Sequence, residues 1–282
     1  MKIAISAEST IDLNKGLLEK YQIKTTPFTV TLGDNSYLDG EITTDEIIKF
    51  ATEKKILPKT SAINKYQYDE HFDKLLKEYD AIIHFSLSSE LSSACNNAIA
   101  SARERKNVYV VDTKSLSTGI ALLAIYAKEL VDAGETFKTI YSKCTTRIPF
   151  VQASFALKRL DFLYKGGRCS ALAFFGANLL KIRPQIIVKE GKMISGKKYR
   201  GNYETVVKKY CDDVLEEFNT PDLKHAFVTY TTASESVVET AIEKLKDRGF
   251  KNIHVTRAGG TIASHCGEDC LGILYINDGK CN

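Results

Sequence analysis

Apolar and polar residues follow two different periodicities along the first half of the chain. Short β-branched, apolar runs predict strands, and stretches with apolar residues three and four positions apart predict helices between them. Strands that alternate with helices form a mostly parallel sheet covered by helices, so we expect an α/β fold here. The expected strands are 2–6, 23–32, 80–87 and 107–112, and the expected helices are 12–21, 43–55, 68–79 and 93–105.

The second half has a different order of elements, which predicts an α+β or mixed-sheet domain. Two helical patterns lead into a new strand over 147–157, and we place the boundary between domains 1–149 and 150–282 near Pro149. We expect the two domains to pack closely, with a cleft between them. The expected helices are 116–133, 136–146, 203–218 and 235–248, and the expected strands are 147–157, a hairpin over 184–199 joined through Glu190 and Gly191, 225–231, 252–259 and 270–277.

Length and composition agree with two domains of an ordinary globular protein. The chain has 282 residues, of which 44% are hydrophobic and 26% charged, and more than one core is typical of such a length. The net charge of +4 comes without a basic stripe, so nucleic acid is not an expected partner. Residues 1–12 do not resemble a signal peptide, and the longest apolar stretch, 119–127, is far shorter than the ~20 residues of a membrane helix.

We therefore expect a cytoplasmic protein with at most transient contact to a membrane surface. The seven cysteines are scattered, and in such a protein free buried thiols are more frequent than a disulfide framework.

One stretch near the C-terminus, TIASHCGEDCLG at 261–272, gathers possible metal ligands and nucleophiles. His265, Cys266 and Cys270 are the residue types of a zinc site, and Cys266 with His265 could form a nucleophile pair. The spacing favours neither, because there is no C-x-x-C pair and neighbouring side chains diverge on a strand. A third interpretation is that both cysteines pack against the adjacent apolar strand. We expect no metal.

Two stretches collect hydroxyl groups where we expect a strand to meet a helix. Thr60 and Ser61 follow Pro58, and Ser92 and Ser93 close a serine-rich run that begins at Ser86. Such hydroxyls either cap the following helix or, with the free backbone N–H groups of the helix start, bind an anion. We expect both stretches to follow strands of the same parallel sheet, and this favours the anion site, because ligands collect at the carboxyl ends of such strands.

Phosphate-binding motifs are missing. Neither G-x-G-x-x-G nor the P-loop pattern occurs, and the nucleophile elbow G-x-S-x-G is also absent. If phosphoryl chemistry is involved, a partner must supply the nucleotide.

The chain contains nine short motifs that resemble those of the DegV family, occur in the same order and extend over essentially the whole chain. The chain departs from the family pattern at Glu8, where the family usually has Asp, and in the runs 93–95, 181–184 and 266–269, so that Glu268 and Asp269 replace residues with special backbone preferences. The matching motifs are ESTIDL, YLDGEIT, PKTS, LSSELSSACNNA, VVDTKSLSTG, LDFLYKGGR, LLKIRP, KKYRG and SHCGEDCLG.

The resemblance implies a non-catalytic, fatty-acid-binding subunit without a cofactor. Family members hold a long-chain fatty acid with its tail in an apolar tunnel. A separate ATP-dependent fatty acid kinase phosphorylates the carboxylate, and the acyl phosphate then passes to an acyltransferase of phospholipid synthesis. Carried over to this chain, the resemblance implies that the carboxylate binds to Thr60 or Ser61 and to Ser92 or Ser93, beside His265, and that Arg200 and Arg168 face the kinase or the phosphate.

A fatty acid has an apolar tail and a polar carboxylate, which suit an apolar tunnel and a cluster of hydroxyl groups, respectively. Burying ~15 methylenes at ~0.8 kcal/mol each contributes on the order of 12 kcal/mol before entropy is counted. The apolar run 170–182 could be a tunnel wall or an ordinary core helix. Two other functions remain as rivals: a hydrolase using Ser92 or Cys266 with His265, and a zinc protein.

Overall fold

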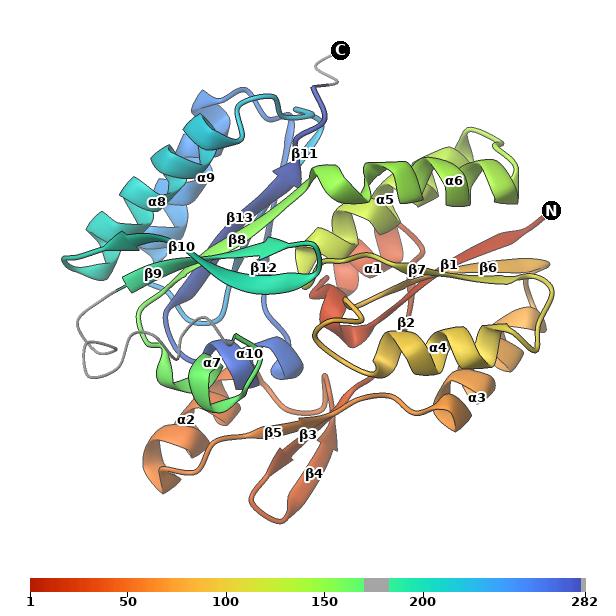
Figure 1. Cartoon of the computed structure of the whole chain (residues 1–282), viewed down its shortest axis with the longest axis horizontal. Coiled ribbons are helices and arrows are strands. Elements are labelled where there is room, and N and C mark those ends of the chain that lie inside the picture. Colours follow the sequence, from red (N-terminus) through yellow and green to blue (C-terminus); the bar gives the residue numbers. More distant parts are fainter. Residues whose placement is uncertain (170–182, 280–282) are drawn as a thin grey trace.

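The computed structural model describes residues 1–169 and 183–279, and its first half contains a four-stranded parallel sheet (Figure 1). The strand order is β2-β1-β6-β7, and all neighbouring pairs are parallel, as the alternation of strands and helices predicts. The strands are β1 (Ile3–Glu8), β2 (Lys24–Thr26), β6 (Ala81–Ser86) and β7 (Val108–Asp112).

Helices cover both faces of this sheet. Helices α3 (Lys65–Leu76) and α4 (Ala94–Ala102) pack together on one face, and α5 (Thr118–Asp132) with α6 (Phe137–Arg147) covers the other (Figure 1). A short helix, α1 (Lys15–Lys20), lies between β1 and β2 in the chain. The arrangement confirms the expected α/β architecture.

A small antiparallel sheet interrupts this pattern and corrects two of our predictions. Residues 23–32 do not form one strand: β2 ends before Pro27, which has no N–H to donate to a ladder, and β3 (Thr29–Leu32) joins a separate sheet. Its neighbours are β4 (Asn35–Leu38) and β5 (Lys59–Ser61). Thr60 and Ser61 therefore lie within β5 and do not follow a strand of the parallel sheet.

Helix α2 (Thr44–Lys54) follows β4, and it begins at a capping box formed by Thr43 and Glu46. The Thr43 hydroxyl accepts a hydrogen bond from the Glu46 N–H, and the Glu46 carboxylate accepts one from the Thr43 N–H. These two bonds satisfy N–H groups that the helix itself leaves without partners.

The second half forms a six-stranded mixed sheet in the order β10-β9-β8-β13-β11-β12. The predicted hairpin is confirmed, since β9 and β10 pair antiparallel through the turn at Glu190 and Gly191. Helices α8 (Tyr203–Glu217) and α9 (Glu235–Asp247) cover one face. The strands are β8 (Val151–Leu157), β9 (Arg183–Lys189), β10 (Lys192–Tyr199), β11 (His225–Tyr230), β12 (Asn252–Arg257) and β13 (Cys270–Ile276).

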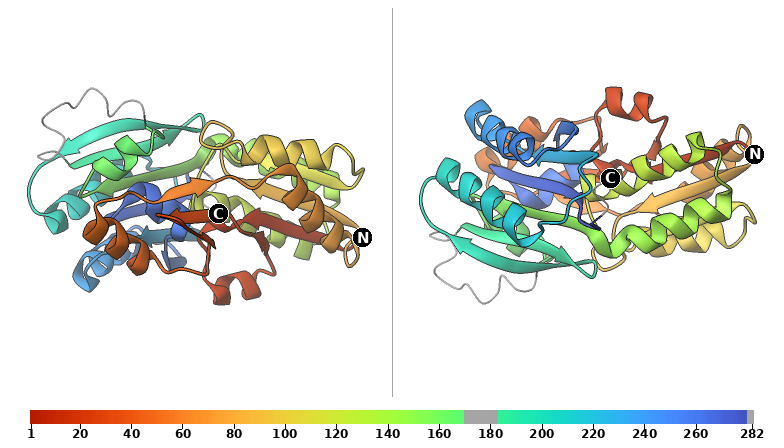
Figure 2. Two further views of the ribbon diagram at one scale, coloured as in Figure 1. Left: turned by 90° about the horizontal axis from the view of Figure 1, so that it is seen from below. Right: turned by 90° about the horizontal axis from the view of Figure 1, so that it is seen from above.

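Helix α5 connects the two sheets and is buried from Thr118 to Ile125. It contacts β1 and β6 of the parallel sheet and β8, β11 and β13 of the mixed sheet. Successive strand residues point to opposite faces, so Phe227 of β11 joins the core around α5 while Val228 faces α8 and α9. Figure 2 shows the two sheets on either side of this helix. The domain boundary at 149/150 stays a prediction.

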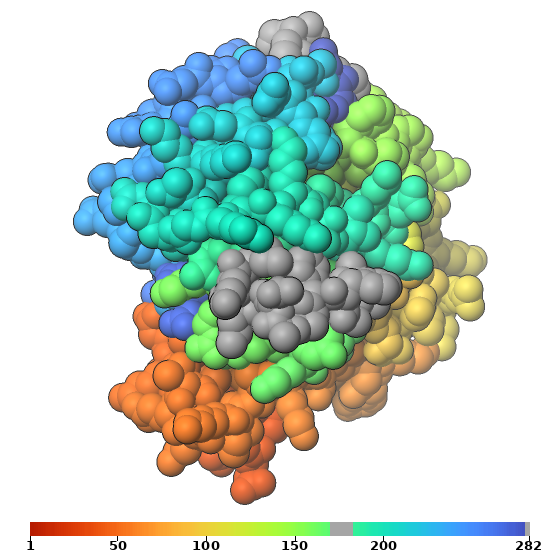
Figure 3. Space-filling model, turned by 60° about the vertical axis from the view of Figure 1, so that its left-hand side comes forward, coloured from red at the N-terminus to blue at the C-terminus, as the bar shows by residue number. Residues whose placement is uncertain are grey.

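The C-terminal motif contains a helix that we did not predict. Residues Gly260–Cys266 form α10, so His265 and Cys266 lie on a helix and not on a strand. A short helix, α7 (Asp161–Lys165), was also missed. In the space-filling view the green segment with α7 lies between the orange region of α2 and the teal hairpin β9–β10 (Figure 3).

Within the described residues, no helix has the length and apolarity that crossing a membrane requires. Five of the cysteines, Cys95, Cys144, Cys211, Cys266 and Cys270, are buried free thiols, as predicted.

We expect Leu123→Ala to lower the free energy of unfolding by about 2–5 kcal/mol. Leu123 lies in α5, is fully buried and belongs to the core between the two sheets, so that truncation leaves a cavity. Urea denaturation followed by circular dichroism measures the change. Ile56→Ala, at a residue that is 51% exposed, is the matched control and should shift the free energy by less than about 0.5 kcal/mol.

Candidate functional site

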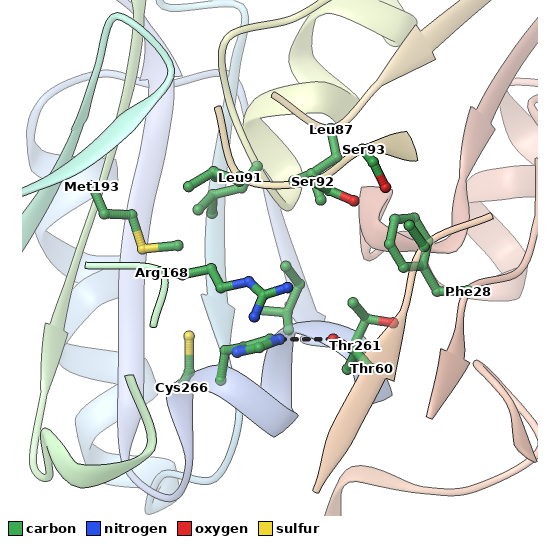
Figure 4. A pocket seen from close by; sticks show the side chains of 14 residues that line it. Phe28, Thr60, Leu87, Leu91, Ser92, Ser93, Arg168, Met193, Thr261 and Cys266 are labelled. Atoms are coloured by element: carbon green, nitrogen blue, oxygen red, sulfur yellow. Dashed lines mark hydrogen bonds between the residues drawn. The ribbon is translucent and has the colours of Figure 1, made fainter. Parts of the chain in front are cut away.

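The strongest candidate site is a cavity of about 180 Å³ at the junction of the two halves. Strand β5, the loop before α4, the segment after α7, strand β10 and helix α10 each contribute side chains to its wall (Figure 4). The lining residues are Phe28, Thr60, Ala62, Leu87, Leu91, Ser92, Ser93, Leu116, Arg168, Met193, Thr261, Ile262, His265 and Cys266.

The structure brings Thr60 and His265 together although 205 positions separate them in the sequence. Thr60 Oγ1 and His265 Nε2 are hydrogen-bonded at 2.8 Å (Figure 4). Ser61, the next residue of β5, is exposed and does not line the cavity. Because adjacent strand residues point to opposite faces, only Thr60 of this pair reaches the site.

Two acidic residues of the first half hold the start of α10, which carries His265. The Asp39 carboxylate accepts hydrogen bonds from the N–H groups of Gly260 (2.7 Å) and Thr261 (3.2 Å), and Asp12 accepts one from Gly259 (2.8 Å). The first N–H groups of a helix have no partners within the helix, so carboxylates at this end also interact favourably with its dipole. These bonds explain why the segment is helical here.

His265 is largely buried and lies directly against Gly166. A Cβ atom added to Gly166 would come within 2.6 Å of His265 Nδ1, so only glycine fits this position. The Nδ1 atom has no hydrogen-bond partner among the described residues. Burial, assisted by the charge of Arg168, lowers the pKa of His265 to about 4, and the ring is neutral at neutral pH.

Some hydroxyl groups of the serine-rich loop form hydrogen bonds within the fold, and others line the cavity. Ser86 donates to Glu8, Ser88 donates to the Gly191 carbonyl oxygen, and Ser89 donates to Asp112. Ser92 accepts from the Ala94 N–H at 3.2 Å and lines the cavity, whereas the N-cap residue Ser93 makes no capping bond through its side chain. Capping therefore accounts for Ser92 only in part and does not account for Ser93.

We did not predict the buried hydrogen-bond network that lies next to this loop. The Glu8 carboxylate is fully buried and accepts hydrogen bonds from the Leu87 N–H (2.8 Å), the Ser86 hydroxyl (2.6 Å) and the Tyr68 hydroxyl (2.7 Å). His84 lies 3.3 Å from the same carboxylate. Glu8 thus fixes the loop just before the residues that line the cavity. The acidic residue at the end of a buried strand was the available signal.

Arg168 lines the cavity and Arg200 does not. The exposed Arg168 side chain extends into the cavity, and its guanidinium also donates to the Gly166 carbonyl oxygen at 2.8 Å (Figure 4). Arg200 is exposed just after β10, the edge strand of the mixed sheet.

A narrower, almost entirely apolar cavity of about 30 Å³ lies behind the first. Leu116, Ile262 and Cys266 line both, so the two cavities are neighbours. The inner cavity continues between α5 and the mixed sheet, where Phe155, Leu274 and Cys270 contribute to its wall. The run 170–182, which we predicted as a tunnel wall or a core helix, lies outside the described residues.

Comparison with known proteins identifies the family. The DegV family model, described as that of an uncharacterised protein family, matches residues 2–278. The chain belongs to the DegV family. A DegV domain-containing protein of Clostridium acetobutylicum is 30% identical over 280 residues, which cover 98% of each chain.

Other DegV relatives are described by what they bind. A "fatty acid-binding protein" of Thermotoga maritima is 33% identical over 226 residues, covering 77% of this chain and 78% of the relative. The structure of a DegV family protein from Thermus thermophilus, described for its fatty acid binding, superimposes with a TM-score of 0.89 at 27% identity, over 98% of this chain and all of that one. The shared architecture confirms the predicted two-part fold.

The departure of this DegV chain from the family pattern at Glu268 and Asp269 has a structural counterpart. Asp269 adopts a positive φ of 48°, and its carboxylate pairs with Lys158 at 2.5 Å. Glu268 pairs with Arg159 at 3.2 Å. Lys158 and Arg159 lie at the start of the segment that contains α7 and Arg168. The two ion pairs therefore hold this segment against the turn after α10.

Neither rival chemistry gains support from the geometry. Among residues 1–169 and 183–279, no group of three or more His, Cys, Asp and Glu side chains could hold a metal ion. Within the same residues, no hydrogen bond links His265 to Ser92 or Cys266, and the Nε2 atom of His265 is hydrogen-bonded to Thr60.

We expect the free energy of unfolding to fall as the pH is lowered from about 6.5 toward 4, and His265→Gln to reduce this loss by about 2–3 kcal/mol. The pKa of His265 is about 4 in the folded chain and about 6.5 in the unfolded one, so the unfolded state binds more protons in this window. The stabilisation is therefore complete above pH 6.5 and is lost on acidification.

Urea denaturation of both proteins across this pH range measures the difference. Burial also lowers the pKa values of His71 to about 3 and His254 to about 4, and these residues contribute equally to both proteins. Identical pH dependence of the two proteins would contradict a buried, neutral His265.

Proposed function

We propose that this DegV protein binds a long-chain fatty acid and presents its carboxylate to a separate kinase. The observation that carries the proposal is a cavity lined by hydroxyl groups beside a neighbouring apolar cavity in the core. The fatty-acid-binding relatives from Thermotoga maritima and Thermus thermophilus support it.

Hydroxyl groups and a helix start would hold the carboxylate. Ser92 and Ser93 stand at the N-terminus of α4, where the helix dipole favours negative charge, and Thr60 reaches the cavity from β5. Each hydroxyl can donate one hydrogen bond to a carboxylate oxygen, and bonds to a charged group contribute about 1.5–3 kcal/mol. Neutral His265 would orient the Thr60 hydroxyl. Ser61 faces away, so we assign the β5 contribution to Thr60.

The tail would lie in the apolar inner cavity. Leu87, Leu91, Leu116 and Met193 surround the first part of its path, and the inner cavity offers almost no polar surface to a tail. Burial of apolar surface supplies most of the affinity, and the hydroxyl cluster decides which end of the ligand stays near the surface.

The two arginines would act in transfer of the phosphoryl group. Arg168 lines the same cavity as the hydroxyl cluster and would contact a phosphate formed on the carboxylate, and exposed Arg200 is available to a partner. The ATP-dependent kinase would supply the nucleotide, which agrees with the missing phosphate-binding motifs. The protein would then carry the acyl phosphate, shielded from water, to an acyltransferase.

The double variant Thr60→Ala/Ser92→Ala should retain fatty acid at least about tenfold more weakly than the unaltered protein, because it removes two donors to a charged group. Arg200→Ala should retain fatty acid normally and slow phosphorylation by the partner kinase. Organic extraction followed by mass spectrometry measures the retained lipid, and transfer of labelled phosphate measures the kinase step.

Ser61→Ala is the matched control for retention, because its hydroxyl lies on the same strand but outside the cavity. Absence of lipid in the purified protein, together with no binding of added fatty acid, would refute the proposal. Equal loss of retention in the Arg200 and Thr60/Ser92 variants would refute the division of roles.

A further inference from the structure

A second hollow lies beside the inner apolar cavity, and Tyr230 lines both. This second hollow is a groove of about 580 Å³ between the first half and strand β12. Polar and charged residues, including Asp12, Asp39 and Arg257, line much of the groove, whereas the inner cavity is almost entirely apolar. The inner cavity suits a hydrocarbon tail, whereas the groove also presents charged side chains.

Two hydrogen-bonded pairs lie between the inner cavity and the groove, and we call them the partition. In each pair one residue lines the inner cavity and the other lines the groove. Ser117 of the inner cavity donates to the Asp12 carboxylate at 2.5 Å, and Thr229 of the inner cavity is hydrogen-bonded to Thr256 at 3.1 Å. All four side chains are buried, with at most 6% exposed.

The backbone at the first pair is strained on both sides. Ser117 has φ 51° and ψ −138°, a conformation that is essentially restricted to glycine, and Asp12 has a left-handed φ of 53°. A non-glycine residue stays in such a conformation only when its surroundings require it. Here the requirement is that the Ser117 hydroxyl reaches Asp12, whose other oxygen holds the Gly259 N–H.

Other contacts brace the partition from behind. Thr118 Oγ1 lies 2.6 Å from Thr229 Oγ1, which ties the second pair to the first turn of α5. Burial raises the pKa of Asp12 to about 8, against the lowering effect of its hydrogen bonds to Ser117 and Gly259.

We propose that the partition sets the inner end of the tail cavity, so that the Ser117–Asp12 and Thr229–Thr256 pairs determine how long a fatty acid tail the protein accepts. This inference rests on the proposed function. A methyl end can extend only as far as the apolar surface continues, because further extension would break two buried polar pairs without replacing their hydrogen bonds. Removal of one wall residue would connect the inner cavity with the groove.

Ser117→Gly is the sharpest test. It removes the hydroxyl and also places glycine in the one conformation where serine is strained. The unaltered and variant proteins are incubated with an equimolar series of straight-chain saturated fatty acids of increasing length, and the retained lipids are extracted and measured by mass spectrometry. We expect the variant to shift toward longer chains, with about a fourfold gain in relative retention for each additional methylene that becomes buried.

Thr229→Ala tests the second pair independently. If Ser117→Gly fails to fold, the length profile of Thr229→Ala decides whether the partition limits the tail length. Ser264→Ala is the control, because Ser264 is also buried, donates to the Gly260 carbonyl oxygen and lines neither the two cavities nor the groove. We expect its length profile to match that of the unaltered protein.

The outcomes separate this inference from the proposed function. Unchanged length profiles in folded Ser117→Gly and Thr229→Ala, while both retain fatty acid, would overturn the partition as the length limit and leave the proposed function intact. A shift of the same size in Ser264→Ala would also overturn it. No retention of any fatty acid by the unaltered protein would instead refute the proposed function.

Discussion

The site depends on the hydrogen bonds that tie the start of α10 to the first half of the chain. Asp12 and Asp39 together accept hydrogen bonds from three consecutive backbone N–H groups, those of Gly259, Gly260 and Thr261. A helix held at its first turn has a fixed direction and rotation, so the side chain of His265 is brought to Thr60. Without this attachment the hydroxyls of the first half and the histidine of the second would have no common site.

A second constraint follows from α5, which packs between the two sheets and joins them into one core. The cavities lie beside the start of this helix, where Leu116 and Ser117, just before its first turn, line the wall. The apolar space that would take the tail is therefore continuous with the core itself. The same packing places Thr118 behind the partition, so that core, cavity and cavity end share one supporting helix.

Local rules predicted most elements because their signals lie within a few residues of each other. The capping box at Thr43, the hairpin at Glu190–Gly191 and the amphipathic helices depend on short-range spacing. The misses involve long-range partners: β5 exists because β3 lies beside it, and α10 begins where Asp39 caps it. The polar role of Glu8 was missed for the same reason, because its donors come from distant segments.

The sequence by itself determined the family, most of the elements and the residue types of the site, because motifs and periodicity depend on neighbouring positions. Tertiary structure alone decided that Thr60 and not Ser61 enters the cavity, that Arg168 lines it while Arg200 lies outside, and that Ser117 meets Asp12. The physical reason is that strand facing, helix capping and hydrogen bonding between the halves depend on atoms that approach only when the chain is folded.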